Sequence, residues 1–295
     1  MKPSILISSH FAYFNVRTGM TLFVKDLAEY LSTDYDVTVH TVRDIVHDRL
    51  VVNNVTYITG ASWHNKSDYD ITIGHSPHNG GCDVQLFDTV KHDEYGPQIT
   101  RPKLAVFSTR AVQKHYDYPG IVLHPIVYPE RNKARRGRKI TLIGMTNVKG
   151  MDLLLELARA NPKLEFLGVR AGWRCDTQEH PELPNLEIMQ QTDDVRKIWR
   201  KTKVLLVPSY EQYGKVGVEA SACGIPTIAM DCEGARESLG ASGTLIAGKY
   251  ILDWQIALTR VLDNYKEYSH KAVQHSKTID SITELELLKK EIERL

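Results

Sequence analysis

The chain has 295 residues, 42% of them apolar, and 37 basic against 36 acidic groups give a net charge of +1. Domains usually hold roughly 100–200 residues, so this length predicts two domains. No apolar run approaches the roughly 20 residues needed to cross a bilayer, which excludes a transmembrane class. The four cysteines show no CxxC pairing, and the start of the chain reads as a first strand rather than a signal peptide. A reduced, cytoplasmic protein is therefore expected.

Short apolar strands alternate with a helical pattern in the first part of the chain. Strands are expected at 5–7, 37–39, 71–73 and 104–107. Apolar residues spaced three and four apart predict a helix over 20–31. Strands separated by helices indicate a parallel sheet.

A basic segment follows this part. Residues 131–139 carry six basic and no acidic groups. Closely spaced prolines at 119–129 exclude a helix there and favour an extended connector. We therefore expect a Rossmann-like domain at 1–125 and a basic linker at 126–138. The basic charges either keep a hinge solvated or contact an anionic membrane or acceptor; nucleic acid is the less favoured partner.

The second part repeats the alternation and ends in a charged tail. The expected strands are 140–144, 164–167, 186–189, 204–207 and 227–230, and the expected helices are 151–160, 193–201 and 215–223. These elements define a second domain at 139–275. The tail at 276–295 is expected to contain an amphipathic helix.

The stretch from Val204 to Gly240 is the most informative about function. It predicts a buried strand, a polar loop with Glu211 and Gly214, a helix with Glu219, and a second buried strand. Such a loop lies at the carboxyl end of a parallel strand, where open α/β sheets bind ligands. N–H groups at a helix start suit phosphate, and carboxylates accept hydrogen bonds from sugar or ribose hydroxyls.

This stretch resembles the signature of retaining GT-B glycosyltransferases, most closely glycosyltransferase family 4. The matching residues are Pro208-Ser209, Glu211, Gly214, Glu219-Ala220, Ala222, Gly224 and Pro226. The resemblance implies a GT-B fold, in which two Rossmann-like parallel-sheet domains face a central cleft. It also implies transfer of a sugar from a UDP- or GDP-sugar with retention of configuration, without a cofactor or an essential metal. In such proteins the last helix often crosses back to the first domain.

The resemblance assigns roles to the residues of this stretch. Glu211 would hold sugar hydroxyls beside the reacting carbon, and Glu219 would accept the ribose hydroxyls. Backbone N–H groups of Gly214, Lys215 and Val216 would orient the sugar and phosphate. The acceptor proton would pass to the leaving phosphate.

A second matching stretch, residues 142–155, contains Lys149-Gly150. Lys149 matches the family lysine that binds the diphosphate, where an ammonium offsets the charge that grows on the leaving group. The departure is Met145, which stands where the family usually has arginine. Either Arg170 or Arg174 supplies the missing cation, or activation of the leaving group is weaker.

The match is partial in the first domain. The family has a glycine-rich loop after the first strand, and this chain offers only Gly19 there. A family histidine that touches the donor sugar corresponds to His75 or His78, and we prefer His78 because Asn79-Gly80-Gly81 indicates a loop over the site.

Two alternatives to a glycosyltransferase stay open. One is another GT-B enzyme, such as a nucleotide-sugar epimerase or a phosphorylase. The other is a non-catalytic nucleotide-sugar-binding module, which Met145 and the sparse glycine loop would allow. The first domain normally selects the acceptor, and here it is short, so the sequence does not name the acceptor. A peripheral membrane contact through 131–139 is the alternative to a purely cytoplasmic location.

Overall fold

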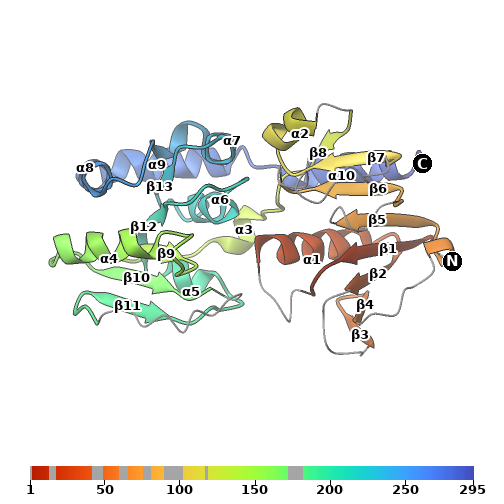
Figure 1. The fold of residues 1–295 in the computed structure, drawn as a ribbon, viewed down its shortest axis with the longest axis horizontal. Coiled ribbons are helices and arrows are strands. Elements are labelled where there is room, and N and C mark those ends of the chain that lie inside the picture. The colour runs from red at the N-terminus through yellow and green to blue at the C-terminus, as the bar shows by residue number, and fades with distance from the viewer. Residues whose placement is uncertain are drawn as a thin grey trace. The chain divides into compact units, whose positions relative to one another are not determined.

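The computed structural model describes residues 2–12, 18–41, 49–59, 66–75, 81–89, 102–116, 119–171 and 182–295. The chain divides into two compact units: Met1–Ile126 together with Ser281–Leu295, and Val127–Asp280. Each unit is built on its own largely parallel sheet (Figure 1).

The first unit contains a sheet of order β3-β4-β2-β1-β5-β6-β7-β8. Its strands are β1 (Ser4–Ser9), β2 (Asp36–Thr41), β3 (Arg49–Val52), β4 (Val55–Thr59), β5 (Ile71–His75), β6 (Val84–Phe87), β7 (Leu104–Phe107) and β8 (Ile121–Val122). The central strand β1 pairs in parallel with β2 and with β5. It is buried over 5–9 on both faces, which explains its continuous apolar run.

The four strands expected in this unit are confirmed, but the β3–β4 hairpin is missing from the sequence prediction. Its strands are antiparallel and are joined at Asn53-Asn54. Both asparagines have positive φ, +50° and +63°. Two left-handed residues form the turn that suits a two-residue hairpin, and asparagine tolerates this conformation well.

The expected helix at 20–31 is confirmed as α1 (Gly19–Leu31). It begins with reciprocal bonds: Thr21 N donates to Thr18 Oγ1 at 3.2 Å, and Thr18 N donates to Thr21 Oγ1 at 2.9 Å. In the described part of this unit the other helices are η1 (Lys66–Asp68), α2 (Arg110–Tyr116) and α10 (Ser281–Ile292).

The tail helix α10 belongs to the first unit, although its sequence follows the second. Leu285, Leu288 and Ile292 are buried on one of its sides. Glu284 accepts bonds from the backbone N–H of His124, at 2.9 Å, and pairs with its Nδ1, at 2.7 Å. Apolar burial and this polar contact together hold α10 in place.

The second unit contains a parallel sheet of order β11-β10-β9-β12-β13-β14. Its strands are β9 (Lys139–Ile143), β10 (Phe166–Val169), β11 (Leu186–Met189), β12 (Thr202–Val207), β13 (Thr227–Met230) and β14 (Thr244–Ile246). Its helices are α3 (Pro129–Asn132), α4 (Met151–Ala160), α5 (Arg196–Trp199), α6 (Lys215–Ser221), α7 (Glu233–Leu239), η4 (Gly240–Ser242), α8 (Ile251–Asp263) and α9 (Tyr265–Ser276).

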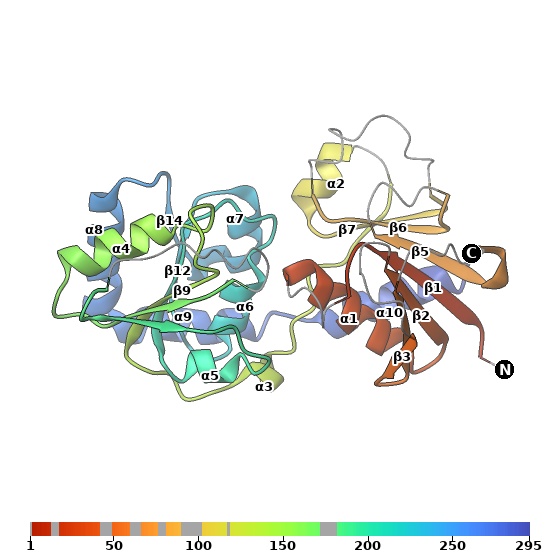
Figure 2. The same ribbon diagram turned by 60° about the horizontal axis from the view of Figure 1, so that its bottom comes forward.

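Helices cover both faces of this sheet (Figure 2). Alternate strand residues point to opposite faces. Leu206 therefore packs in a core with residues of α4 and α8, whereas Leu205 packs in a second core with residues of α5, α6 and α7. This doubly wound arrangement explains why the strands of this unit are apolar on both sides.

Two helix predictions are wrong. The helix expected at 193–201 shrinks to the single turn α5, because β12 already begins at Thr202 and the Asp194 carboxylate accepts a bond from Arg196 N at 3.1 Å. The proline-rich connector does contain a helix, α3, of which Pro129 is the first residue. A proline there loses no helical hydrogen bond, because the first N–H groups of a helix are unpaired anyway.

The packing of α10 leads to a stability prediction. Leu288 is 0% exposed and its neighbour Leu287 is 42% exposed. Leu288→Ala should lower the free energy of unfolding by about 2–5 kcal/mol through the lost burial and the cavity. Leu287→Ala should change it by less than about 0.5 kcal/mol. Urea denaturation measures both, and equal losses would contradict this orientation of the helix.

Candidate functional site

The second sheet has a topological switch point between β9 and β12. From β9 the strand order runs to β10 and β11 at one edge, and from β12 it runs to β13 and β14 at the other. At such a reversal, open α/β sheets typically have a crevice at the carboxyl ends of the two central strands, and their ligands bind there. Residues 144–150 follow β9 and residues 208–214 follow β12, so both candidate motifs begin at this point.

Lys149 and Glu211 meet at the switch point. They are 62 residues apart in sequence, and Lys149 Nζ lies 2.5 Å from Glu211 Oε1. Ser209 Oγ donates to the same carboxylate oxygen. The lysine side chain is 42% exposed, and ion pairs this open to water contribute only about 0–1 kcal/mol to stability. Stability alone therefore does not explain this cluster.

Gly150 allows the two loops to approach each other. Its φ is +93°, and a Cβ built on it would lie 2.3 Å from Cγ of Pro208. Only glycine fits here, because a side chain would be strained and would also collide with the proline ring. The loop after β9 is further held by the N–H groups of Gly144 and Met145, which both donate to Val169 O at 2.9 Å.

The loop after β12 is supported from behind by the start of α7. A Cβ on Gly234 would lie 2.2 Å from the carbonyl oxygens of Glu211 and Gln212. Cys232 Sγ donates to Glu211 O at 3.5 Å. The backbone beside Glu211 thus packs directly on α7. The sequence gives little sign of these supporting residues, since they follow the next strand, β13.

The remaining donor-binding candidates of this unit lie at the start of α6. Gly214 precedes the helix in a left-handed conformation with φ +73°, and Lys215 and Val216 are its first two residues. Lys215 Nζ and Glu219 Oε1 are 3.9 Å apart, and their side chains are only 12% and 14% exposed. The helix is shorter than the expected 215–223, because it ends at Ser221.

The Met145 side chain is buried in the core and does not take the position of a cation at the candidate site. Its side chain is 6% exposed and belongs to the core shared with α4 and α8. It occupies the space that a side chain on Gly168 would need, since a Cβ there would lie 1.9 Å from its sulfur. Arg170 follows β10, and its backbone N–H donates to Met189 O at 2.9 Å. Arg174 lies outside the described residues.

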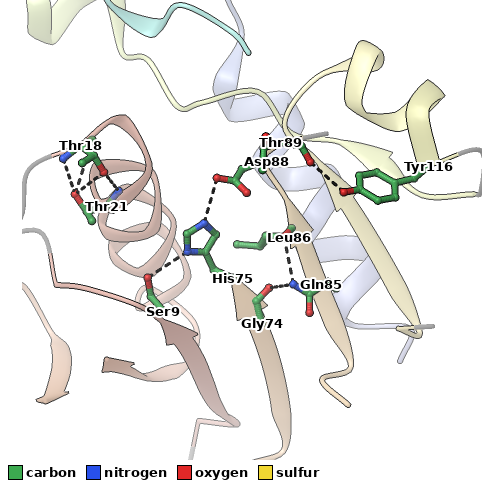
Figure 3. Close-up of polar contacts among 10 residues, drawn as sticks. All are labelled: Ser9, Thr18, Thr21, Gly74, His75, Gln85, Leu86, Asp88, Thr89 and Tyr116. Carbon is green, nitrogen blue, oxygen red and sulfur yellow. Dashed lines mark hydrogen bonds and ion pairs between the residues drawn. The ribbon is translucent and has the colours of Figure 1, made fainter. Parts of the chain in front are cut away.

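In the first unit, His75 is held at the carboxyl edge of the sheet (Figure 3). It is the last residue of β5 and is buried. Its Nδ1 lies 3.2 Å from Ser9 Oγ, and its Nε2 lies 3.6 Å from Asp88 Oδ2. The imidazole is therefore oriented by Ser9, the last residue of β1, and by Asp88, the residue after β6. The preferred candidate, His78, lies outside the described residues.

Gly19 is the first residue of α1, directly after the capping residue Thr18. Apart from its two chain neighbours and the backbone of its own helix, no atom of the described residues lies within 4 Å of the position that its Cβ would take. The packing of the described residues therefore does not demand a glycine here. An open backbone at the start of a helix would allow a ligand to approach closely.

No group of three or more His, Cys, Asp or Glu side chains in the described ranges is arranged to hold a metal ion. The described helices also include none that is long and apolar enough to cross a membrane.

The two-sheet architecture is the GT-B fold, which confirms the fold predicted from the sequence. The structure resembles Anabaena HepE in complex with UDP and glucose, with a TM-score of 0.74 and 14% identity over 99% of this chain and 100% of HepE. It also resembles an alpha,alpha-trehalose-phosphate synthase (UDP-forming) from Burkholderia vietnamiensis, with a TM-score of 0.71 and 13% identity over 99% of this chain and 97% of the synthase.

Residues 137–264 match the family described as glycosyl transferases group 1. This match covers the switch point, Lys149, Glu211 and Glu219, and it confirms the resemblance to retaining glycosyltransferase family 4. The chain thus carries a group 1 glycosyltransferase domain on a GT-B fold.

Curated relatives are D-inositol 3-phosphate glycosyltransferases. The protein from Mycolicibacterium smegmatis is 38% identical over 77 residues, which cover 25% of this chain and 18% of the relative. The protein from Nocardia farcinica is 33% identical over 170 residues, which cover 54% of this chain and 33% of the relative. The match thus spans a third or less of the length of these relatives.

The contact between the two loops leads to a second prediction. Gly144 and Gly150 both have positive φ, but a Cβ on Gly144 would have 3.5 Å to its nearest neighbour, Cγ of Lys149. Gly144→Ala should cost about 1–2 kcal/mol of backbone strain. Gly150→Ala should cost about 1–3 kcal/mol more, because Pro208 must move. Denaturant unfolding of the two variants tests this difference, and an equal loss would argue against the contact with Pro208.

Proposed function

We propose that the protein is a retaining glycosyltransferase that moves a sugar from a nucleotide diphosphate sugar to an acceptor. The observation that carries this proposal is the meeting of Lys149 and Glu211 at the switch point of a group 1 glycosyltransferase domain. A cation and a carboxylate at that crevice suit a diphosphate and a sugar respectively.

A UDP-sugar is the first donor to test. HepE, which shares the fold, forms complexes with UDP-glucose and with UDP and glucose. GDP-sugars belong in the same panel, because the described contacts do not select a base. Transfer or hydrolysis of the sugar, followed by mass spectrometry, is the direct test.

The proposed roles follow from the positions of the groups. Lys149 and Glu211 form an ion pair in which their opposite charges offset each other. A bound diphosphate would offer Lys149 a partner of higher charge and would release Glu211 oxygens for sugar hydroxyls. Glu219 would accept the ribose hydroxyls, and backbone N–H groups of Gly214, Lys215 and Val216 would orient the phosphate and sugar. Arg170, Gly19 and His78 complete the proposed donor contacts.

The chemistry asked of the protein is mainly electrostatic. As the bond between sugar and phosphate breaks, negative charge grows on the diphosphate, and an ammonium placed there in advance lowers the barrier. The acceptor proton would pass to the leaving phosphate, so this proposal assigns no protein base and no metal.

The proposal does not specify which acceptor is used or whether the protein acts at a membrane. The curated relatives are named for D-inositol 3-phosphate, so this phosphorylated polyol belongs in the acceptor panel. Contact of residues 131–139 with an anionic membrane or acceptor is part of the same proposal, because these residues carry six basic groups.

Met145 favours one second candidate, a nucleotide-sugar-binding module without transferase activity. Its burial in the core leaves no cation where the family usually has arginine. Binding of nucleotide sugars without transfer or hydrolysis, over the whole donor and acceptor panel, would support this candidate against the enzyme.

The proposed ribose contact gives a third prediction. Glu219→Gln should weaken UDP or GDP binding by about 1.5–3 kcal/mol, roughly 10- to 150-fold in Kd, because a charged hydrogen bond becomes a neutral one. Calorimetry measures the affinity, and circular dichroism checks the fold. Glu156→Gln, on the exposed side of α4, is the matched control. An unchanged affinity in Glu219→Gln would remove the ribose assignment.

The fourth prediction separates Glu211 from Glu219. Glu211→Ala should lower turnover by about 10²–10³-fold, the usual scale for one electrostatic group at a reacting centre. Its affinity for free nucleotide diphosphate should hold or rise slightly, because Lys149 loses the partner that competes with phosphate. If turnover and affinity fall together, Glu211 has a structural role instead.

A further inference from the structure

A second basic segment accompanies the basic linker. Residues 131–139 contain six basic groups and residues 196–203 contain five, and neither segment contains an acidic residue. More than fifty residues separate them in the sequence. Each segment by itself is a short charged stretch of the kind found in solvent-exposed loops and helix ends.

The fold lays these two segments side by side. Gly137 N donates to Thr202 O at 2.9 Å, and the N–H groups of Arg138 and Lys139 donate to Lys201 O at 3.1 and 2.8 Å. The approach is close enough to require a glycine, because a Cβ on Gly137 would lie 2.4 Å from the Cα of Lys201. The two basic stretches thus form one surface.

Two residues outside the segments hold cations from both. Glu187 pairs with Lys139 at 2.6 Å and with Lys201 at 2.5 Å. The Tyr265 ring lies under Arg136, at 5.4 Å, and under Lys203, at 5.1 Å. One carboxylate and one aromatic ring therefore contact four of the basic groups, which lowers their mutual repulsion without removing the excess positive charge.

A net positive charge remains on this surface. Five acidic residues lie beside its eleven basic ones (Glu130, Glu165, Glu187, Asp193 and Asp194), which leaves +6. Four exposed cations make no ion pair with any described residue: Arg135, Arg138, Lys197 and Arg200. Unpaired positive charge that is concentrated on one surface attracts a polyanion.

The surface lies at the opposite edge of the sheet from the donor-site candidates. Its two segments run directly into the amino ends of β9 and β12, whereas Lys149 and Glu211 follow the carboxyl ends of the same strands. An anionic partner at the amino edge would therefore leave the switch point open.

We propose that residues 131–139 and 196–203 form one composite docking surface for an anionic phospholipid membrane. This deepens the membrane contact included in the proposed function, and it stands whether or not the chain transfers sugar. A membrane fits better than nucleic acid. The only aromatic residue of the two segments, Trp199, is 0% exposed, so it offers no ring for base stacking. The helix α5 has only four residues and is too short to follow a groove.

Vesicle co-sedimentation without any donor tests the proposal. Vesicles of phosphatidylcholine mixed with phosphatidylglycerol should bind the protein at low salt and release it at high salt, and pure phosphatidylcholine should not bind it. Each cation near such a surface is worth about fivefold in binding. R135Q/R138Q and K197Q/R200Q should each lower the partition coefficient by at least about tenfold, and the quadruple variant by at least about 100-fold.

The matched control carries K114Q, K249Q, K277Q and K290Q, which remove the same charge at exposed positions elsewhere in the chain. It should bind vesicles within about threefold of the unchanged protein, since only nearby charges contribute beyond a Debye length. An equal loss in control and quadruple variant would overturn the proposal in favour of net charge. If R135Q/R138Q lowered vesicle binding and K197Q/R200Q did not, the docking surface would consist of residues 131–139 alone.

Two further outcomes oppose the proposal: no vesicle binding at low salt, or binding of RNA without binding of vesicles. UDP affinity, measured by calorimetry on the quadruple variant, should stay within about twofold, because its residues lie at the other edge of the sheet. Vesicle binding with no sugar transfer would leave this surface in place while the enzyme assignment fails.

Discussion

The second unit depends on the parallel pairing of β9 with β12. This pairing is made by two strands that are far apart in the chain, and it sets which loops meet at each end. At the carboxyl end it brings Gly150 against Pro208, and that contact in turn places Lys149 beside Glu211. At the amino end it brings Gly137 against Lys201. A glycine thus makes the close approach at both ends, because any side chain would force the two loops apart.

The direction of the strands separates two kinds of charge along one sheet. Parallel strands send all their carboxyl ends to one edge. The oppositely charged pair of Lys149 and Glu211 lies at that edge. The positively charged surface of 131–139 and 196–203 lies at the other. A compact ligand with both phosphate and hydroxyl groups suits the first arrangement, and an extended anionic partner suits the second.

The core explains the departure at Met145. A thioether is flexible and apolar, so it can fill the space above Gly168, where an arginine would need to leave the core to keep its charge in water. The cation expected from the family pattern is thus replaced by packing between β10 and the loop after β9. Any compensation must come from groups on neighbouring loops, and Lys149 is the described cation that already contacts Glu211.

The sequence alone determined the strands at 104–107, 186–189 and 227–230 and the helix at 151–160, because their patterns are local and strong. It also predicted the resemblance to group 1 glycosyltransferases, through Glu211, Glu219 and the alanine, glycine and proline residues that lie in register with them. Tertiary structure decided which distant residues meet: Lys149 with Glu211, and the linker with residues 196–203. Those contacts depend on strand order and register, which a local pattern does not encode. The single-turn α5 and the α3 helix at Pro129 were also decided there, since the start of β12 and the tolerance of a helix start for proline outweighed local periodicity.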